Sequence, residues 1–236
     1  MTGDKNKKEE IVLKKRKCLR TEYQIEDISV SILCLLSHGG MPRWLSITKR
    51  GRRMFPQLET ERLRLRELTA EDASMVLSCF SNEDVIRFYG QEKMAEIEEA
   101  KRVIDFFAQN FREGRGIRWG IERKETSSII GTVGLNAWVP KHKRAEIGYE
   151  LHPDYWGMGY ASEAVSAILA YGFDDLELTR IGAVVFLENG SSNRLLKNLG
   201  FQREGILRRY IYQNKKANDV YMYSLVREVG NSSDDC

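Results

Sequence analysis

Hydrophobic and charged positions alternate in the segment RLRLREL, residues 62–68. A period of two predicts a strand with one buried face. Similar strand patterns occur at residues 117–122, 128–139 and 144–151, and residues 180–187 form a short apolar run typical of a buried strand. Strands are therefore expected to dominate the chain from Phe55 onward.

Helical spacing fills the gaps between these strands. Thr69 precedes an apolar stretch with acidic residues in its first turn, so it is expected to cap a helix that runs to Phe80. Two further helices are expected from Gly159 and over residues 191–199. A longer amphipathic helix is expected over residues 94–111, with an apolar face formed by Ile97, Ile104, Phe107 and Phe111.

The last two strand candidates, residues 201–213 and 219–226, flank the turn sequence NKKAN. Such an arrangement predicts a closing antiparallel pair. Strands with helices between them indicate the α/β class.

Charge divides the chain at residue 53. Residues 1–53 hold 13 Lys/Arg and 6 Asp/Glu, a net charge of +7, whereas the remainder holds 24 and 28, a net charge of −4. An acidic body does not favour nucleic acid as a partner. We interpret residues 1–53 as a disordered basic extension rather than an arm for RNA or anionic lipid, because aromatic residues for base stacking are nearly absent there.

Met54 is a candidate for the natural start of the protein. The purine-rich codons of the preceding KRGRR would resemble a ribosome-binding site, in which case residues 1–53 are not native. The sequence thus predicts one domain over residues 54–229 and a flexible tail over residues 230–236.

No segment predicts secretion or a membrane span. The longest apolar run, residues 28–36, is shorter than the roughly 20 residues that a spanning helix needs, and it has no cleavage pattern. The four cysteines, Cys18, Cys34, Cys79 and Cys236, show neither paired nor metal-ligand spacing. We therefore expect a cytoplasmic protein without a metal site, in which Cys79 is a core residue. His142 is assigned to a hairpin loop, and His152 to packing or a polar contact.

Two glycines, Gly157 and Gly159, stand where an aromatic run gives way to a helix in DYWGMGYASEA. Free amides at a helix start carry the positive end of the helix dipole, and glycine lets a diphosphate approach them. The stretch indicates an anion-binding loop, although G-x-G before a helix is also a common tight turn. A dinucleotide-binding fold is not favoured, because Ser162 stands in place of the third glycine. A Walker loop is excluded, because no G-K-[ST] sequence occurs.

Four ordered motifs together resemble the GNAT acyl-CoA N-acyltransferases. They are LETERLRLREL (residues 58–68), EIGYELHP (146–153), HPDYWGMGYASEA (152–164) and NGSSNRLLKNLGF (189–201). Within that superfamily they resemble the Rim-type group, which acetylates N-terminal amines of ribosomal proteins. The resemblance implies a GNAT fold: a mixed, mostly antiparallel sheet with helices on both faces, splayed between two central parallel strands at residues 144–151 and 180–187.

The resemblance also implies where acetyl-CoA binds. Its pyrophosphate would meet the amides of the glycine loop, and its pantetheine arm would lie along the edge of residues 149–151. The implied cofactor-binding residues are Tyr149, Leu151, Trp156, Gly157, Met158, Gly159, Tyr160, Ala161 and Asn189. Asp154 stands where many relatives have a basic residue or glutamine, which weakens any side-chain contact to phosphate there.

By resemblance, Asn189 contacts the pantetheine or the amine, and Ser192 protonates the leaving sulfur. Leu196 occupies the position where many relatives carry a tyrosine. The alternative is that Asn189 and Ser192 only cap a helix. Glu146 and Glu150 share one face of their strand, and either is a candidate for the base that removes the amine proton; both would otherwise be solvent-exposed strand residues.

The acceptor side is expected in NEDVIRFYG, where Arg87, Phe88 and Tyr89 are candidates to line the acceptor groove. The predicted activity is direct transfer of an acetyl group from acetyl-CoA to a primary amine, for example a protein N-terminus, by a monomer or homodimer. Three alternatives remain open at this point: a small-molecule amine as acceptor, an acyl-CoA-binding module without turnover, and a nucleic-acid-associated protein that acts through residues 1–53.

Overall fold

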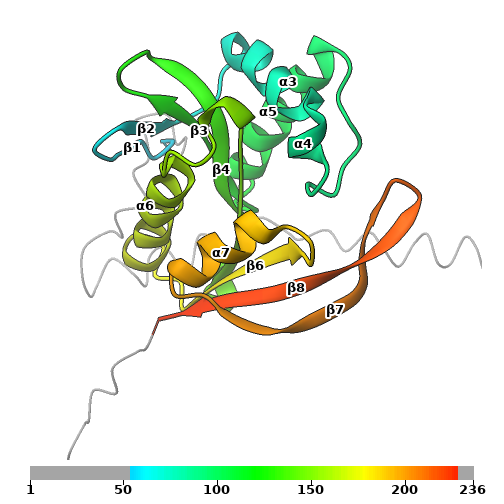
Figure 1. Cartoon of the computed structure of the whole chain (residues 1–236). Helices are drawn as coiled ribbons and strands as arrows, with labels where there is room; N and C mark the ends of the chain where they lie inside the picture. Colours follow the sequence, from blue (N-terminus) through cyan, green and yellow to red (C-terminus); the bar gives the residue numbers. More distant parts are fainter. Residues whose placement is uncertain (1–53, 228–236) are drawn as a thin grey trace, which may run out of the picture. The chain divides into compact units, whose positions relative to one another are not determined.

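The strands form one mixed sheet, and the helices pack on both of its faces (Figure 1). The computed structural model describes residues 54–227. Its eight strands lie in the order β1-β2-β3-β4-β5-β6-β8-β7, and every neighbouring pair is antiparallel except β5 and β6. The predicted fold class is therefore confirmed.

The elements have the following bounds. The strands are β1 (Leu58–Glu59), β2 (Leu63–Arg66), β3 (Ile117–Arg123), β4 (Ser128–Val139), β5 (Arg144–Leu151), β6 (Arg180–Phe186), β7 (Gln202–Gln213) and β8 (Lys216–Val226). The α-helices are α3 (Ala73–Ser81), α4 (Glu83–Ile86), α5 (Ile97–Arg112), α6 (Tyr160–Asp174) and α7 (Gly190–Asn198). Short 3₁₀ turns are η3 (Ala70–Asp72), η4 (Pro140–His142) and η5 (Pro153–Tyr155).

Two local expectations need correction, and two short elements were not predicted. Thr69 begins a 3₁₀ turn, and the α-helix starts only at Ala73, because the Asp72 carboxylate accepts from the Thr69 amide (2.8 Å) and caps the turn. Ile97 is 37% exposed; it is the first residue of α5 and does not belong to the buried face. The two-residue strand β1 and the single-turn helix α4 were not predicted, because such short elements carry no periodicity.

Two hydrophobic clusters lie against the sheet. One packs residues of α6, such as Ile168, against Trp119 and Leu135 of the central strands. The other packs α3 and α5, through residues such as Phe80 and Ile104. Both sides of the central strands are thus covered, which explains why their sequences are more apolar than strict alternation would give.

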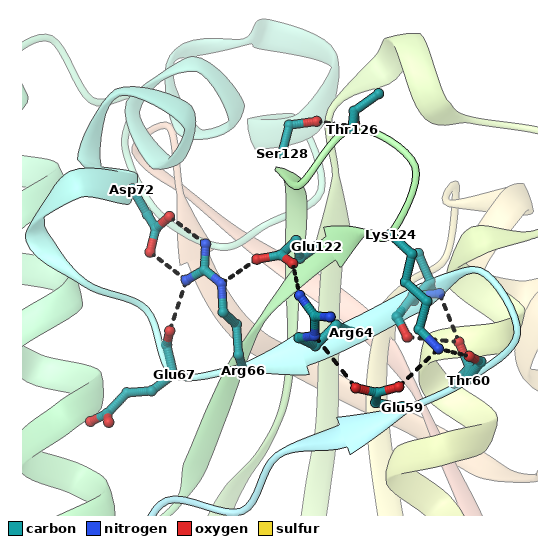
Figure 2. A network of polar contacts seen from close by, with 11 residues as sticks. Glu59, Thr60, Arg64, Arg66, Glu67, Asp72, Glu122, Lys124, Thr126 and Ser128 are labelled. Carbon is teal, nitrogen blue, oxygen red and sulfur yellow. Dashed lines mark hydrogen bonds and ion pairs between the residues drawn. The ribbon is translucent and has the colours of Figure 1, made fainter.

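An ion-pair network ties the first strands together (Figure 2). The buried carboxylate of Glu122 on β3 accepts from Arg64 (2.7 Å) and Arg66 (2.5 Å), the two outward positions of the alternating segment on β2. Arg66 also holds Asp72 of η3 in a bidentate pair. The network fixes β2, and with it the residues just before β2 that reach the candidate site.

The sheet opens between β5 and β6. Only Arg144–Glu146 of β5 pair with Arg180–Gly182 of β6, and β6 then continues alongside β8. Residues 147–151 of β5 thus have no strand partner on that side within the described chain. The opening places backbone and side chains of both strands around a common space, which is where the candidate site lies.

Predictions for residues 1–53 and 230–236 lie outside the described residues and stay predictions, including the start at Met54 and the domain boundaries. Among the helices that the structure describes, none is long and apolar enough to cross a membrane.

Candidate active site

Two adjacent cavities occupy the opening between β5 and β6. Their volumes are about 480 Å³ and about 760 Å³. Residues that line both cavities mark their junction: Phe88, Tyr89, Tyr149, Asn189 and Ser192. Molecules bound in the two cavities would meet at these five side chains.

The larger cavity leads from the junction to the start of α6. Besides Tyr149 and Asn189 it is lined by most of the predicted cofactor-binding residues, namely Leu151, Trp156, Gly157, Gly159, Tyr160 and Ala161. Met158 is the exception; it does not line this cavity, and its side chain is exposed.

The glycine loop presents free amides at the start of α6. Gly157 and Gly159 have φ angles of 73° and 82°, the left-handed region that favours glycine. A Cβ at Gly157 would meet no atom within 4 Å, so the space above it is open. The first helical bond runs from the Glu163 amide to the Gly159 carbonyl, and the amides of residues 157–162 donate to no partner in the described structure. The loop therefore has the donors and the dipole end that a phosphate requires.

Arg62 holds this loop from the end of the sheet. Its Nη1 donates to the Met158 carbonyl (2.9 Å), its Nε donates to Glu163 (2.7 Å), and its guanidinium carbon lies 4.5 Å from the centre of the Tyr160 ring. Thr60 also donates to Glu163 (2.6 Å). Partial burial opposes the charge of Glu163, yet these hydrogen bonds lower its pKa. This role of Arg62 was not predicted, because the residue precedes a strand and its sequence neighbours give no sign of a distant contact.

The turn between β6 and α7 is fixed by two asparagines. The Oδ1 of Asn189 accepts from the Ser192 amide (3.1 Å), so Asn189 caps α7 as the alternative interpretation proposed. The Nδ2 of Asn193 donates to the Asn189 carbonyl (2.8 Å), and Tyr223 donates to the Oδ1 of Asn193 (2.9 Å). Ser192 itself is not the cap, and the side-chain Nδ2 of Asn189 has no hydrogen-bond partner in the described part, whereas its backbone amide donates to the Phe186 carbonyl (3.1 Å).

Tyr149 and Ser192 bring two hydroxyl groups to the junction. The Tyr149 hydroxyl is buried and has no hydrogen bond of ordinary geometry within residues 54–227. Burial raises the pKa of Tyr149 to about 12, and the interaction of its hydroxyl with Ser192 opposes that rise. Tyr149 therefore stays protonated at neutral pH and can donate a hydrogen bond at the junction.

Glu150 belongs to a buried polar network. Its carboxylate accepts from Arg118 and from Thr132, and Arg118 also donates to the Thr132 hydroxyl (2.7 Å). The Arg118 side chain crosses β4 at Gly134, where a Cβ would lie 2.7 Å from its Cδ. The Arg118 and Glu150 side chains are only 4% and 3% exposed. Burial opposes the charge of Arg118, but the Glu150 carboxylate raises its pKa overall.

Glu146 has a different setting on the same face of β5. It forms the last pair with β6, opposite Gly182, so it lies where the two strands begin to separate. It is half-buried and lines the smaller cavity. It interacts electrostatically with Arg180, which is itself paired with Glu204, and no hydrogen bond or ion pair of its carboxylate occurs among the described residues. Of the two candidate bases, Glu146 is the one with an unengaged carboxylate.

The segment after α4 forms a wall between the two cavities. Phe88 and Tyr89 line both, whereas Arg87 borders only the larger one. Phe106 and Phe107 of α5 extend the wall of the smaller cavity. Neither residue was predicted to lie at the site, because their spacing is that of an ordinary amphipathic helix.

Cys79 and the two histidines behave as expected. Cys79 is 2% exposed and belongs to a hydrophobic cluster, and burial raises the pKa of its thiol to about 12. His142 lies in the β4–β5 connection, and His152 accepts from the Asp154 amide (3.4 Å). Residues 54–227 contain no group of His, Cys, Asp and Glu that could hold a metal ion.

Comparison with known proteins gives the family of this fold and site. Residues 62–202 match the acetyltransferase (GNAT) domain, which is more than half of the chain. The chain belongs to the GNAT acetyltransferase family. It is 54% identical over 174 residues to the uncharacterized N-acetyltransferase YoaA of Bacillus subtilis (strain 168), which covers 74% of this chain and 98% of the relative.

Two further GNAT relatives carry more specific names. The spermidine N(1)-acetyltransferase of Escherichia coli (strain K12) is 28% identical, over 64% of this chain and 79% of that protein. The structure of a "putative ribosomal-protein-serine acetyltransferase" from Vibrio cholerae is 26% identical, with a TM-score of 0.65 over 74% of this chain and all of that one. The resemblance to the Rim-type group is thus confirmed. The protein is an N-acetyltransferase, and acetyltransferases of this family use acetyl-CoA.

Proposed function

We propose that this GNAT enzyme transfers the acetyl group of acetyl-CoA directly to a primary amine at the junction of the two cavities. The observation that carries the proposal is the shared lining: Tyr149, Asn189 and Ser192 border both the cavity that ends at the free amides of α6 and the cavity beside Glu146. Acetyl-CoA in the larger cavity and an amine in the smaller one would then meet at these residues. The edge of residues 147–151 would pair with the pantetheine amides, because it has no partner from β6.

Direct transfer is favoured over an acyl-enzyme. No cysteine lines either cavity, and Cys79, the one cysteine in the described residues, is buried with a raised pKa. A thiol in that state is a poor nucleophile. The amine itself is then the nucleophile, so it must lose a proton, and the departing thiolate must gain one.

Glu146 and Ser192 are assigned to these two proton transfers. The free carboxylate of Glu146 would accept the amine proton, directly or through a water molecule. The Ser192 hydroxyl would donate a proton to the departing sulfur and regain one from solvent, and the Tyr149 hydroxyl, which lines the same junction, would be a second donor there. Glu150 is assigned a positioning role, because both of its oxygens are already engaged by Arg118 and Thr132.

We assign the α-amine of a protein N-terminus as the preferred acceptor. The smaller cavity has aromatic walls from Phe88, Phe106 and Phe107, which suit the apolar part of a peptide end. An α-amine has a pKa near 8 against roughly 10.4 for lysine, so it asks less of a single carboxylate. The name of the Vibrio cholerae relative is consistent with a protein acceptor. The Escherichia coli relative makes a polyamine the second candidate, since Glu146 could also face a cationic amine.

Thiol release separates these possibilities. The protein is incubated with acetyl-CoA and, in turn, peptides with a free N-terminus, the same peptides with a blocked N-terminus, and spermidine. We expect release with the free peptides alone. Thiol release with spermidine alone would shift the proposal to the second acceptor. If neither the peptides nor spermidine caused thiol release, the proposal would be contradicted. Intact-mass analysis after acetyl-CoA alone should show no acetylated protein, and a stable adduct would contradict direct transfer.

A further inference from the structure

A buried glutamine at the tip of the last hairpin reaches across to the wall of the candidate site. Gln213, the last residue of β7, is 4% exposed. Its amide nitrogen donates to the Ile86 carbonyl (2.8 Å) and to the Gln91 carbonyl (2.9 Å). These partners lie 127 and 122 residues earlier in the chain. One side-chain amide therefore binds both ends of the segment 87–90.

The hairpin is shaped so that Gln213 arrives there. Asn214 and Lys215 both have positive φ angles (52° and 58°), the conformation of a two-residue turn that matches the twist of a hairpin. Between Leu207 and Ile211 the register of the two strands shifts, and the Arg209 amide donates to the Asp219 carboxylate (2.8 Å). Such a bulge bends a strand pair. Figure 1 shows the hairpin projecting beyond β6 on the side of α4.

The segment between the two carbonyls is the wall described above. It carries Phe88 and Tyr89, which line both cavities. A second contact supports it: Gly90 has a φ of 82°, and a Cβ there would lie 3.2 Å from the Ile211 Cγ2 of the same hairpin. The Tyr89 amide donates to the Ile86 carbonyl (3.0 Å), so the wall residue and Gln213 share one acceptor.

We propose that Gln213 is a positioning residue that sets the affinity for the amine by fixing the segment 87–90. A buried amide that satisfies two carbonyls at once defines their separation and thereby the path of the residues between them. The inference rests on the proposed function only in taking the smaller cavity as the acceptor site. Gln213 touches neither cavity, so its effect on catalysis passes through Phe88 and Tyr89.

The test compares Gln213→Met with a matched change on the same hairpin. Methionine keeps the length of the side chain and removes both donors. Asn218 provides the control, because its Nδ2 donates only within the hairpin, to the Ile211 carbonyl (3.4 Å) and the Lys216 carbonyl (3.0 Å). Hydrogen exchange of residues 86–91 is measured together with the KM of the best amine, kcat, and the Kd of acetyl-CoA.

We expect Gln213→Met to raise the exchange rate of the Tyr89 amide and the amine KM each by about tenfold, because the two hydrogen bonds to the Ile86 and Gln91 carbonyls are lost. The change in kcat should stay below about threefold, because the reacting groups are retained. Asn218→Ala should change neither the exchange rate of the Tyr89 amide nor the amine KM. Should Gln213→Met fail to fold, Gln213→His, which keeps one donor, is expected to give the same effects at reduced size.

Two results would overturn the inference. Unchanged exchange at residues 86–91 in a folded variant would show that Gln213 does not hold the segment. Increased exchange with an unchanged amine KM would show that the contact is structural only. If the unaltered enzyme releases no thiol with any amine, the proposed function fails, whereas the exchange comparison alone still decides whether Gln213 holds the wall.

Discussion

Glu146 and Glu150 allow one chemical change to be made twice on the same strand face, with opposite expected results. Glutamine has nearly the same shape as glutamate but lacks the charge. Glu150→Gln removes one partner of a buried ion pair whose side chains are 3% and 4% exposed. Breaking such a pair costs about 3–5 kcal/mol, because the Arg118 charge stays buried without its partner.

The expected loss in Tm follows from that energy. A domain of this size loses about 2–4 °C per kcal/mol, so Glu150→Gln should lower Tm by about 6–20 °C. The double variant Arg118→Met with Glu150→Gln should lose less than the sum of the two single variants, because it leaves no unpaired charge. At a temperature where Glu150→Gln is still folded, its kcat should remain within about tenfold of the original.

Glu146→Gln should have the opposite effects: little change in stability and a large loss of kcat. Its carboxylate has no hydrogen bond within residues 54–227, so stability should change by no more than about 0.5 kcal/mol. Loss of a general base should lower kcat by about 10²–10⁴-fold near neutral pH. The defect should shrink as pH rises above about 8 with an α-amine acceptor, because the amine then loses its proton without help.

Scanning calorimetry and initial rates of thiol release on both variants check these expectations. A stable but inactive Glu150→Gln together with an active Glu146→Gln would exchange the two roles. Full activity of both variants would show that solvent alone accepts the proton, and the assignment of a glutamate base would then be wrong.

Three further outcomes test other parts of the site. Gly157→Val should weaken acetyl-CoA binding at least about tenfold, as measured by calorimetry. The left-handed backbone becomes strained by about 1–2 kcal/mol, and the side chain covers the free amides. Unchanged affinity in a folded variant would rule out the loop as a phosphate site. Ser192→Ala should lower kcat by about 10²-fold or more with little change in the Kd of acetyl-CoA, whereas a purely structural residue would lower Tm and leave turnover intact. Burial raises the pKa of Cys79 to about 12, so peptide mapping should find it unmodified by iodoacetamide at pH 8.5 in the folded protein. The same shift lowers stability as pH rises from about 8.5 towards 12, because the unfolded chain releases the thiol proton first; rapid alkylation of the native protein would contradict the burial of Cys79.

Local patterns were sufficient where the physical cause is itself local. Alternation over residues 62–68 and the apolar run at residues 180–187 identified strands, because burial of one face or both depends on the period of the side chains. The paired glycines located the start of α6 for a similar reason, since a left-handed backbone strongly favours glycine. The family followed from motifs made of these local signals.

The arrangement of the site depended on contacts between distant segments. From the sequence, Glu146 and Glu150 were equivalent candidates for the base. Only the path of the Arg118 side chain across Gly134 shows that the Glu150 carboxylate is held by Arg118, whereas the Glu146 carboxylate is not. Arg62 at the glycine loop and Gln213 at the acceptor wall gave no signal at all, because each acts about 100 residues away from its own position. The sequence by itself determined the longer elements, the glycine loop at the start of α6 and the family, since those depend on short-range periodicity and backbone conformation. Only the tertiary structure decided that Glu150 is paired with Arg118 and that Gln213 binds both ends of the segment 87–90. Hydrogen bonding and burial depend on spatial neighbours that the order of residues along the chain does not specify.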